Sequence, residues 1–106
     1  MDFEQHSRIA ADHPCLAGHF PGNPIVPGVL LLDAVLRAFA AWRPTAQAVD
    51  IPLVKFLAPL RPGQAFIIRL TESASGSVGF DCLEVDGRLL ARGRLKLSDH
   101  RSESIR

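Results

Sequence analysis

The chain has 106 residues, a formal net charge of +1 at pH 7, and 47% hydrophobic residues. A chain of this size folds as one domain with a modest core, and such domains often gain stability from oligomerisation. The nearly balanced charge, with a pI of about 7.9, argues against binding nucleic acid through a basic surface. Cys15 and Cys82 lie far apart and form no disulfide framework, which fits a reducing compartment.

Neither the amino terminus nor the most apolar stretch of the chain has the pattern of an export signal or a membrane span. Met1 to Glu4 lacks the charged-then-apolar run of a signal peptide. The stretch from Val29 to Trp42 is interrupted by two charged residues and is too short to span a bilayer. We therefore expect a cytoplasmic protein with one domain over residues 1–97 and a polar tail over residues 98–106.

The first half of the chain predicts a short strand, a loop and one long helix. Residues 7–11 are expected to form the strand, and a proline- and glycine-rich loop follows up to Gly28. Pro27 suits the first turn of a helix, because the amide hydrogen that it lacks would have no helical partner there. Pro44 ends the helix near Trp42. Apolar side chains surround most of the axis, so we expect this helix to be buried on several sides.

The second half of the chain predicts an antiparallel sheet. A strand is expected from about Ala46 to Leu57. Residues 64–70 and 88–97 alternate apolar and polar side chains, as strands with one buried face do. Between these two segments, Ser75-Gly76-Ser77 and Asp86-Gly87 supply the chemistry of hairpin turns. One apolar helix followed by antiparallel strands indicates an α+β fold, with a sheet wrapped around the helix.

The candidate functional residues are a histidine in the loop and a carboxylate in the helix. Asp33 lies in the most apolar helical stretch of the chain, and His19 precedes it in the proline-rich loop. A carboxylate taken out of water is costly, so it finds a partner or keeps its proton. A protonated acid facing a neutral histidine can remove one proton and deliver another. The pair therefore predicts an enzyme.

Each of these residues also has a simpler structural interpretation. Asp33 could pair with Arg37 one helical turn later, as ordinary i,i+4 ion pairs do. His19 could bridge the carbonyl groups of its own loop. His13, Cys15 and His19 could hold a zinc ion together with an acid, although a second cluster of ligands is missing. The residue types alone leave these alternatives open.

Two motifs carry a resemblance to a known family. Residues 13–35 read HPCLAGHFPGNPIVPGVLLLDAV, which closely resembles the active-site segment of hot-dog-fold 3-hydroxyacyl-[acyl-carrier-protein] dehydratases. Residues 55–64 read KFLAPLRPGQ, which looks like the family's Lys-Phe-x-x-Pro-x-x-Pro-Gly turn between sheet strands. The resemblance implies the hot-dog fold, in which an antiparallel sheet wraps around one long central helix.

The resemblance also implies a reaction and a role for each site residue. A dehydratase of this family removes a proton beside the thioester carbonyl and expels the hydroxyl group of the next carbon as water. His19 would be the base, and Asp33 the acid that protonates the leaving oxygen or activates water for it. The Gly28 amide would bind the enolate-like oxygen at the positive end of the helix. Val29 and Phe20 would complete the substrate-binding residues.

The same resemblance implies the partners of the chain. The substrate would be carried on the phosphopantetheine arm of acyl carrier protein, with no cofactor and no metal. Two protomers would share each site in a homodimer, which a hexamer could extend. The pathway would be fatty-acid, related lipid or polyene biosynthesis.

Two departures and two alternatives accompany the resemblance. Arg37 stands where many members have glutamine, and Asp33 is the shorter of the two acids found in the family. A hot-dog acyl thioesterase would use Asp33 to activate water without needing His19. A non-catalytic hot-dog subunit that binds acyl carrier protein is the second alternative.

Overall fold

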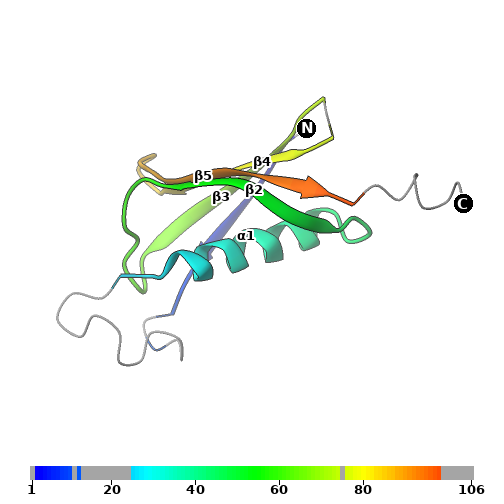
Figure 1. Cartoon of the computed structure of the whole chain (residues 1–106). Coiled ribbons are helices and arrows are strands. Elements are labelled where there is room, and N and C mark those ends of the chain that lie inside the picture. Colours follow the sequence, from blue (N-terminus) through cyan, green and yellow to red (C-terminus); the bar gives the residue numbers. More distant parts are fainter. Residues whose placement is uncertain (1, 11, 13–24, 75, 99–106) are drawn as a thin grey trace, which may run out of the picture.

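The computed structural model of the chain describes residues 2–10, 12, 25–74 and 76–98 (Figure 1). Helix α1 (Gly28–Trp42) packs against one face of a five-stranded antiparallel sheet with the order β1-β3-β4-β5-β2. The α+β fold predicted from the sequence is confirmed. In chain order the strands are β1 (Asp2–Arg8), β2 (Ala48–Phe56), β3 (Ala65–Glu72), β4 (Val78–Glu84) and β5 (Leu89–Leu97).

The core lies between α1 and the sheet. The buried side of the helix follows the helical repeat, and the predicted alternation of β3 buries Phe66, Ile68 and Leu70. No helix among the described residues is long and apolar enough to cross a membrane. The buried helix residues are Leu30, Leu31, Ala34, Val35, Ala38 and Phe39.

The opposite side of α1 does not have the burial that the sequence indicated. Val29 is 69% exposed and Leu36 is 37% exposed, so the expectation of burial on several sides is wrong for the single chain. A single sheet can cover one side of a helix, and the remaining apolar side chains have no described neighbour to cover them. The helix therefore keeps an exposed and largely apolar stripe.

Strand β1 starts earlier than expected. It runs from Asp2 to Arg8 and pairs antiparallel with β3, whereas the sequence indicated residues 7–11. Its inward-facing positions, Phe3, Gln5 and Ser7, are mostly polar, so the strand lacks the apolar alternation that marks a buried face. Pairing with β3 overrides this weak local pattern.

Strand β4 and its pairing with β5 complete the sheet. The predicted hairpin turn at Asp86 and Gly87 joins the two strands, and Gly87 has the positive φ of +99° that favours glycine. The register shifts at Cys82, so that Leu90 and Ala91 are both buried although they are consecutive. A bulge of this kind explains why β5 departs from strict alternation near its start.

The segment of residues 57–64 crosses from β2 at one edge of the sheet to β3 near the other. The amides of Leu57 and Ala58 donate to the Leu90 carbonyl at 2.8 and 3.2 Å. The Val26 amide donates to the Leu60 carbonyl at 2.8 Å, and Leu60 is almost fully buried. The crossing segment therefore fixes the chain immediately before α1 against the end of the sheet.

The other end of α1 is fixed by aromatic packing. Trp42 stacks on Phe3 of β1 with ring centroids 5.8 Å apart. The Arg43 guanidinium lies 4.3 Å from the centre of the Trp42 ring. Such stacking and cation–π contacts add to the energy of the buried apolar area. Both ends of the helix are thereby held in place on the sheet. The tail beyond Ser98 lies outside the described residues.

Gly93 of β5 offers a direct test of the packing between strands. A methyl group there would lie 2.5 Å from the Phe80 Cζ atom and would also meet the Leu53 carbonyl oxygen. We expect Gly93→Ala to lower the free energy of unfolding by about 1–3 kcal/mol, the usual cost of overpacking. Urea denaturation measures the change.

Gly79→Ala is the matched control, because the nearest atom to its methyl group would be 3.8 Å away. This variant should be as stable as the wild type or gain about 0.5 kcal/mol, since alanine restricts the unfolded chain. Equal losses in both variants would contradict the packing described for Gly93.

Cys82 offers a test of core integrity by pH. Burial, and then the charge of Asp81, raise the pKa of the Cys82 thiol from 9.0 to about 12. The folded state therefore holds the thiol protonated, and stability should fall as the pH rises above about 9, where the unfolded thiol ionises. In a Cys15→Ser background, a thiol reagent at pH 8 should react with Cys82 only after unfolding by urea. Rapid labelling of the native protein would contradict this burial.

Candidate functional site

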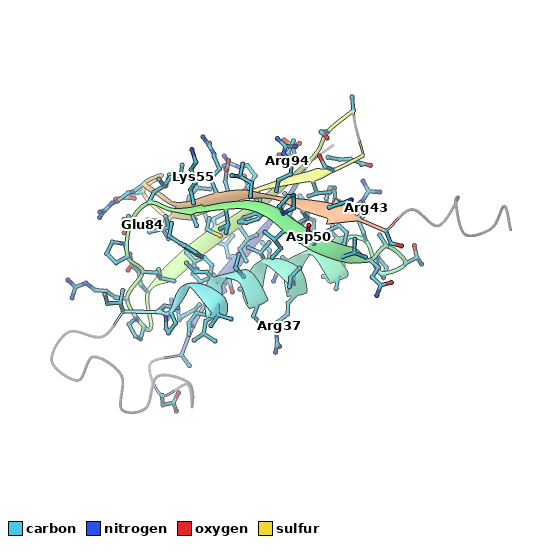
Figure 2. The ribbon with its side chains drawn as sticks, in the orientation of Figure 1. Arg37, Arg43, Asp50, Lys55, Glu84 and Arg94 are labelled. Atoms are coloured by element: carbon cyan, nitrogen blue, oxygen red, sulfur yellow. The ribbon has the colours of Figure 1, made fainter. Side chains whose placement is uncertain are left out.

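Asp33 lies on the side of α1 that faces away from the sheet. Its side chain is 56% exposed, and its Oδ2 atom accepts a hydrogen bond from the Nε atom of Arg37 at 2.8 Å. Arg37 is 80% exposed and projects away from the sheet (Figure 2). The expectation of a desolvated acid is thus wrong for the single chain, and the alternative of an i,i+4 ion pair with Arg37 is what the structure shows.

Asp33 and Arg37 open onto a groove between α1 and β1. The groove has a volume of about 350 Å³. Gln5 and Ser7, the polar residues on the inner side of β1, border the same groove as Asp33. Its lining residues are Gln5, Ser7, Arg8, Ile9, Ala10, Asp33, Ala34 and Arg37.

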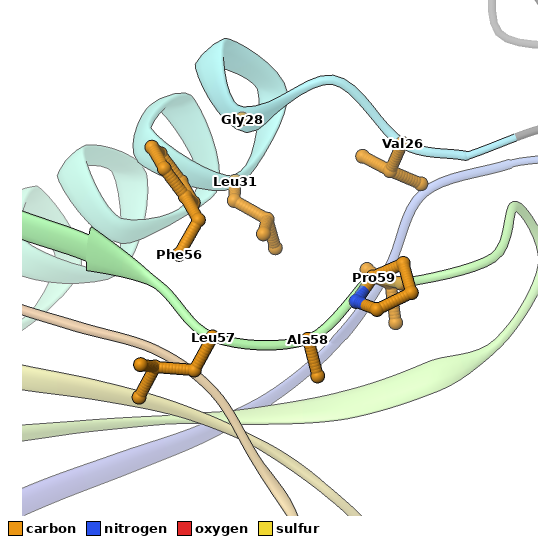
Figure 3. A pocket seen from close by; sticks show the side chains of 8 residues that line it. Val26, Gly28, Leu31, Phe56, Leu57, Ala58 and Pro59 are labelled. Atoms are coloured by element: carbon orange, nitrogen blue, oxygen red, sulfur yellow. The ribbon is translucent and has the colours of Figure 1, made fainter.

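Gly28 lies at a second hollow, at the start of α1. This pocket has a volume of about 340 Å³ and is bordered by the first turn of the helix, the end of β2 and the crossing segment. Figure 3 shows the Phe56 ring beside the first turn of α1. The lining residues are Val26, Gly28, Leu31, Phe56, Leu57, Ala58, Pro59 and Leu60, and none of them carries a charge.

The Gly28 amide is free to bind a ligand as far as the described residues go. Pro27 occupies the N-cap position and provides no side-chain hydrogen bond, and the first turn has no acidic residue. The first amides of a helix have no partner within the helix, and the helix dipole places positive potential there. No described residue accepts a hydrogen bond from Gly28.

The two hollows lie on different sides of the helix and share no lining residue. Gly28 and Asp33 are five positions apart, which at 3.6 residues per turn places them about 140° apart around the axis. The candidate acid and the candidate oxyanion-binding amide of one chain therefore do not converge on a single cavity. Val29, the next predicted substrate-binding residue, is exposed beside Gly28.

Other predicted site residues lie outside the described part of the chain. These are His19 and Phe20, together with the alternative zinc ligands His13 and Cys15. Among the residues that are described, no three histidine, cysteine or acidic side chains gather in an arrangement suited to a metal ion. The roles predicted for His19 and Phe20 stay predictions.

Comparison with known proteins establishes the family. Residues 2–94 match the family model of ApeI-like proteins, described as ApeI dehydratase. The chain belongs to this family of hot-dog-fold dehydratases, and the resemblance noted from its two motifs is confirmed.

Individual relatives agree with this assignment. The chain is 31% identical over 110 residues to the 3-hydroxyacyl-[acyl-carrier-protein] dehydratase FabZ of Chlamydia trachomatis, covering 92% of this chain and 72% of that protein. It is 29% identical over 105 residues to the protein of the same name from Ehrlichia chaffeensis, covering 91% and 73%. The dehydratase heterocomplex ApeI:P from Xenorhabdus doucetiae contains a chain with a TM-score of 0.78 and 24% identity, covering 92% of this chain and 88% of that one.

Sequence reasoning missed two parts of the site. Phe56 belongs to the recognised turn motif, but its contact with Gly28 joins two segments far apart in the chain. Gln5 and Ser7 could not be predicted as site residues, because polar residues at the inner positions of a strand resemble the sequence of a loop. The resemblance of residues 13–35 and of residues 55–64 to the same family was the one hint in the sequence that these two segments meet.

Proposed function

We propose that this protein removes water from a 3-hydroxyacyl thioester carried on acyl carrier protein and yields the trans-2-enoyl thioester. The observation that carries this proposal is the accessible carboxylate of Asp33, which opens onto the groove between α1 and β1. Membership of a dehydratase family supports the same reaction.

In the proposed reaction, His19 takes the proton from the carbon beside the thioester carbonyl. The electron pair moves toward the carbonyl oxygen, and the Gly28 amide stabilises the negative charge that develops there. The bond from the next carbon to its hydroxyl oxygen then breaks, and Asp33 supplies the proton that makes the leaving group water. The proton held by His19 replaces the one lost by Asp33, so the two residues return to their starting states.

Arg37 would orient Asp33 in this reaction. Its Nε–H group occupies Oδ2, so Oδ1 is the oxygen left to face the substrate hydroxyl. A guanidinium has a planar array of donors, so it can hold Oδ2 as an acceptor while the proton to be donated sits on Oδ1. This role fits the substitution of arginine for the glutamine found in many members.

We propose that each site is shared by two copies of the chain in a homodimer. The separation of Gly28 and Asp33 around α1 supports this, because a second copy could bring its own Asp33 toward the Gly28 side. The exposed Val29 and Leu36 give α1 an apolar surface that a partner would cover. Edge strand β2 also exposes Val49 and Leu53 beside an unpaired edge.

The remaining features of the proposal concern partners and setting. The substrate would arrive on the phosphopantetheine arm of acyl carrier protein, and side chains would perform both proton transfers without a cofactor. The cytoplasm is the proposed location, and fatty-acid, related lipid or polyene biosynthesis the proposed setting. A hexamer of three dimers would be a further assembly of the same unit.

The reaction is tested by the product that forms. Wild-type protein incubated with a 3-hydroxyacyl thioester should give the enoyl thioester, whereas a thioesterase would release free thiol and a non-catalytic subunit would give neither. Asp33→Asn should lower the rate by roughly 10²–10⁴-fold, because the amide nearly keeps the shape but cannot supply the acid's proton. His19→Ala should be similarly damaging, and the double variant little worse, because the two residues act as one unit.

Circular dichroism and urea denaturation of the variants provide the control for folding. Asp33 is more than half exposed, so Asp33→Asn should change the free energy of unfolding by less than about 1 kcal/mol. A folded Asp33→Asn protein with near-wild-type dehydration would remove Asp33 from the acid's role.

The shared site is tested by complementation. Inactive His19→Ala and Asp33→Asn chains, mixed under conditions that permit subunit exchange, should regain activity, since one site of each mixed dimer holds both groups. The expected recovery is about a quarter of the wild-type rate per chain, because half of the randomly paired dimers are mixed and each has one working site.

Exchange is verified by mass spectrometry with isotope-labelled chains. Proven exchange without recovery of activity would place each site within one chain. The solved neighbour from Xenorhabdus doucetiae is a heterocomplex, so a chain that is monomeric alone and active only with a second kind of subunit would also refute the homodimer.

A further inference from the structure

The Phe56 side chain lies directly on Gly28. Were Gly28 given a methyl group, that group would lie 2.6, 2.8 and 3.0 Å from the Cζ, Cε1 and Cε2 atoms of the ring. Phe56 is the last residue of β2 and shares the inward-facing side of this strand with Val54, which packs against the core. Phe56 itself is not part of the buried core, however, and 51% of its surface is exposed.

The pocket beside this ring suits an apolar chain. Its side chains offer no charge and no hydrogen-bonding group, so they cannot bind a phosphate or a sugar by side-chain contacts. A volume of about 340 Å³ lies at the small end of the range for small-molecule sites. In Figure 3, Val26 and Leu31 border the space beside the Phe56 ring, above the crossing segment.

We propose that Phe56 is the residue that sets the length of the acyl group that this enzyme accepts. The inference rests on the proposed function, because it assigns the pocket to the acyl chain of the same thioester. If the thioester carbonyl binds at the Gly28 amide, the acyl chain begins within reach of the pocket that Gly28 borders. The Phe56 ring then forms the wall that a short chain contacts and that a longer chain must displace.

The position of the ring makes it a selective wall. Core side chains are held on all sides, but half of the Phe56 surface has no neighbour among the described residues. A smaller side chain there enlarges the pocket without opening a hole in the core. Phe56 lines a different hollow from the Asp33 and Arg37 of its own chain, so its replacement leaves that ion pair untouched.

The test compares chain lengths by binding and by turnover. Non-reactive thioether analogues of butyryl- and dodecanoyl-pantetheine are titrated calorimetrically into the wild type, Phe56→Ala, Phe56→Leu and Phe56→Trp. Phe56→Ala should raise the affinity ratio of the long over the short analogue by roughly tenfold, the usual effect of a small change in an apolar pocket. Phe56→Leu should lie between, and Phe56→Trp should lower the ratio. The kcat/KM values for the matching 3-hydroxyacyl thioesters should follow the same order.

Leu53→Ala is the matched control. Leu53 is about equally exposed on the same strand but faces the other side and borders neither hollow. A change at the β2 edge would affect the short and the long analogue alike, so the replacement of Leu53 should leave the chain-length ratio unchanged. An unchanged ratio in all three Phe56 variants overturns the inference, as does a change only in dimer dissociation, which light scattering would reveal as a role in assembly.

The two proposals fail in different ways. If no thioester is dehydrated by the wild type, the proposed function fails, while the binding ratios still report on Phe56. If the wild type dehydrates its substrate and the Phe56 variants keep its chain-length preference in both assays, the inference alone fails.

Discussion

The packing of one helix against one sheet is the constraint on which the other features depend. The sheet covers the side of α1 that carries Leu31, Val35 and Phe39, and the remaining side stays exposed with Val29 and Asp33 on it. The 3.6-residue repeat makes this division unavoidable, because residues that alternate in the sequence by three and four share one face. The candidate acid is therefore exposed because of where the core lies, although its neighbours in the sequence are mostly apolar.

This division also explains why the two hollows described above border α1 on different sides. The crossing segment and the end of β2 meet the start of α1 on one side, and the polar inner face of β1 meets the middle of α1 on the other. The Gly28 amide and the Asp33 carboxylate lie five positions, about 1.4 turns, apart, so one straight helix presents them on different sides. In the proposed homodimer, two helices would each present one of the two groups to a common cavity.

The sequence predicted those features that depend on local chemistry. Pro44 stopped the helix at Trp42, and the alternation in β3 identified its buried face, because both effects act within a few residues. Features that depend on tertiary contacts were hidden. The polar residues Gln5 and Ser7 break the alternation expected of a strand, so β1 was predicted with the wrong bounds. Its position is decided by its pairing with β3. The exposure of Asp33 depends on how much of the helix a five-stranded sheet can cover, and hydropathy alone does not contain that information.

The missing side chain of Gly28 leaves room for the Phe56 ring and also leaves the backbone amide accessible. Both features limit which substitutions can test this part of the structure. On one side the absence of a Cβ atom admits the Phe56 ring, and along the backbone it leaves the first helical amide open to a ligand. Any side chain at this position would displace the ring and crowd the amide, so a substitution of Gly28 could not separate the proposed chain-length selection from the proposed stabilisation of the oxyanion. A substitution of Phe56 would change only the proposed chain-length selection. Because the Val26–Leu60 hydrogen bond holds the helix start independently of the ring, the pocket wall can change while the amide stays in place.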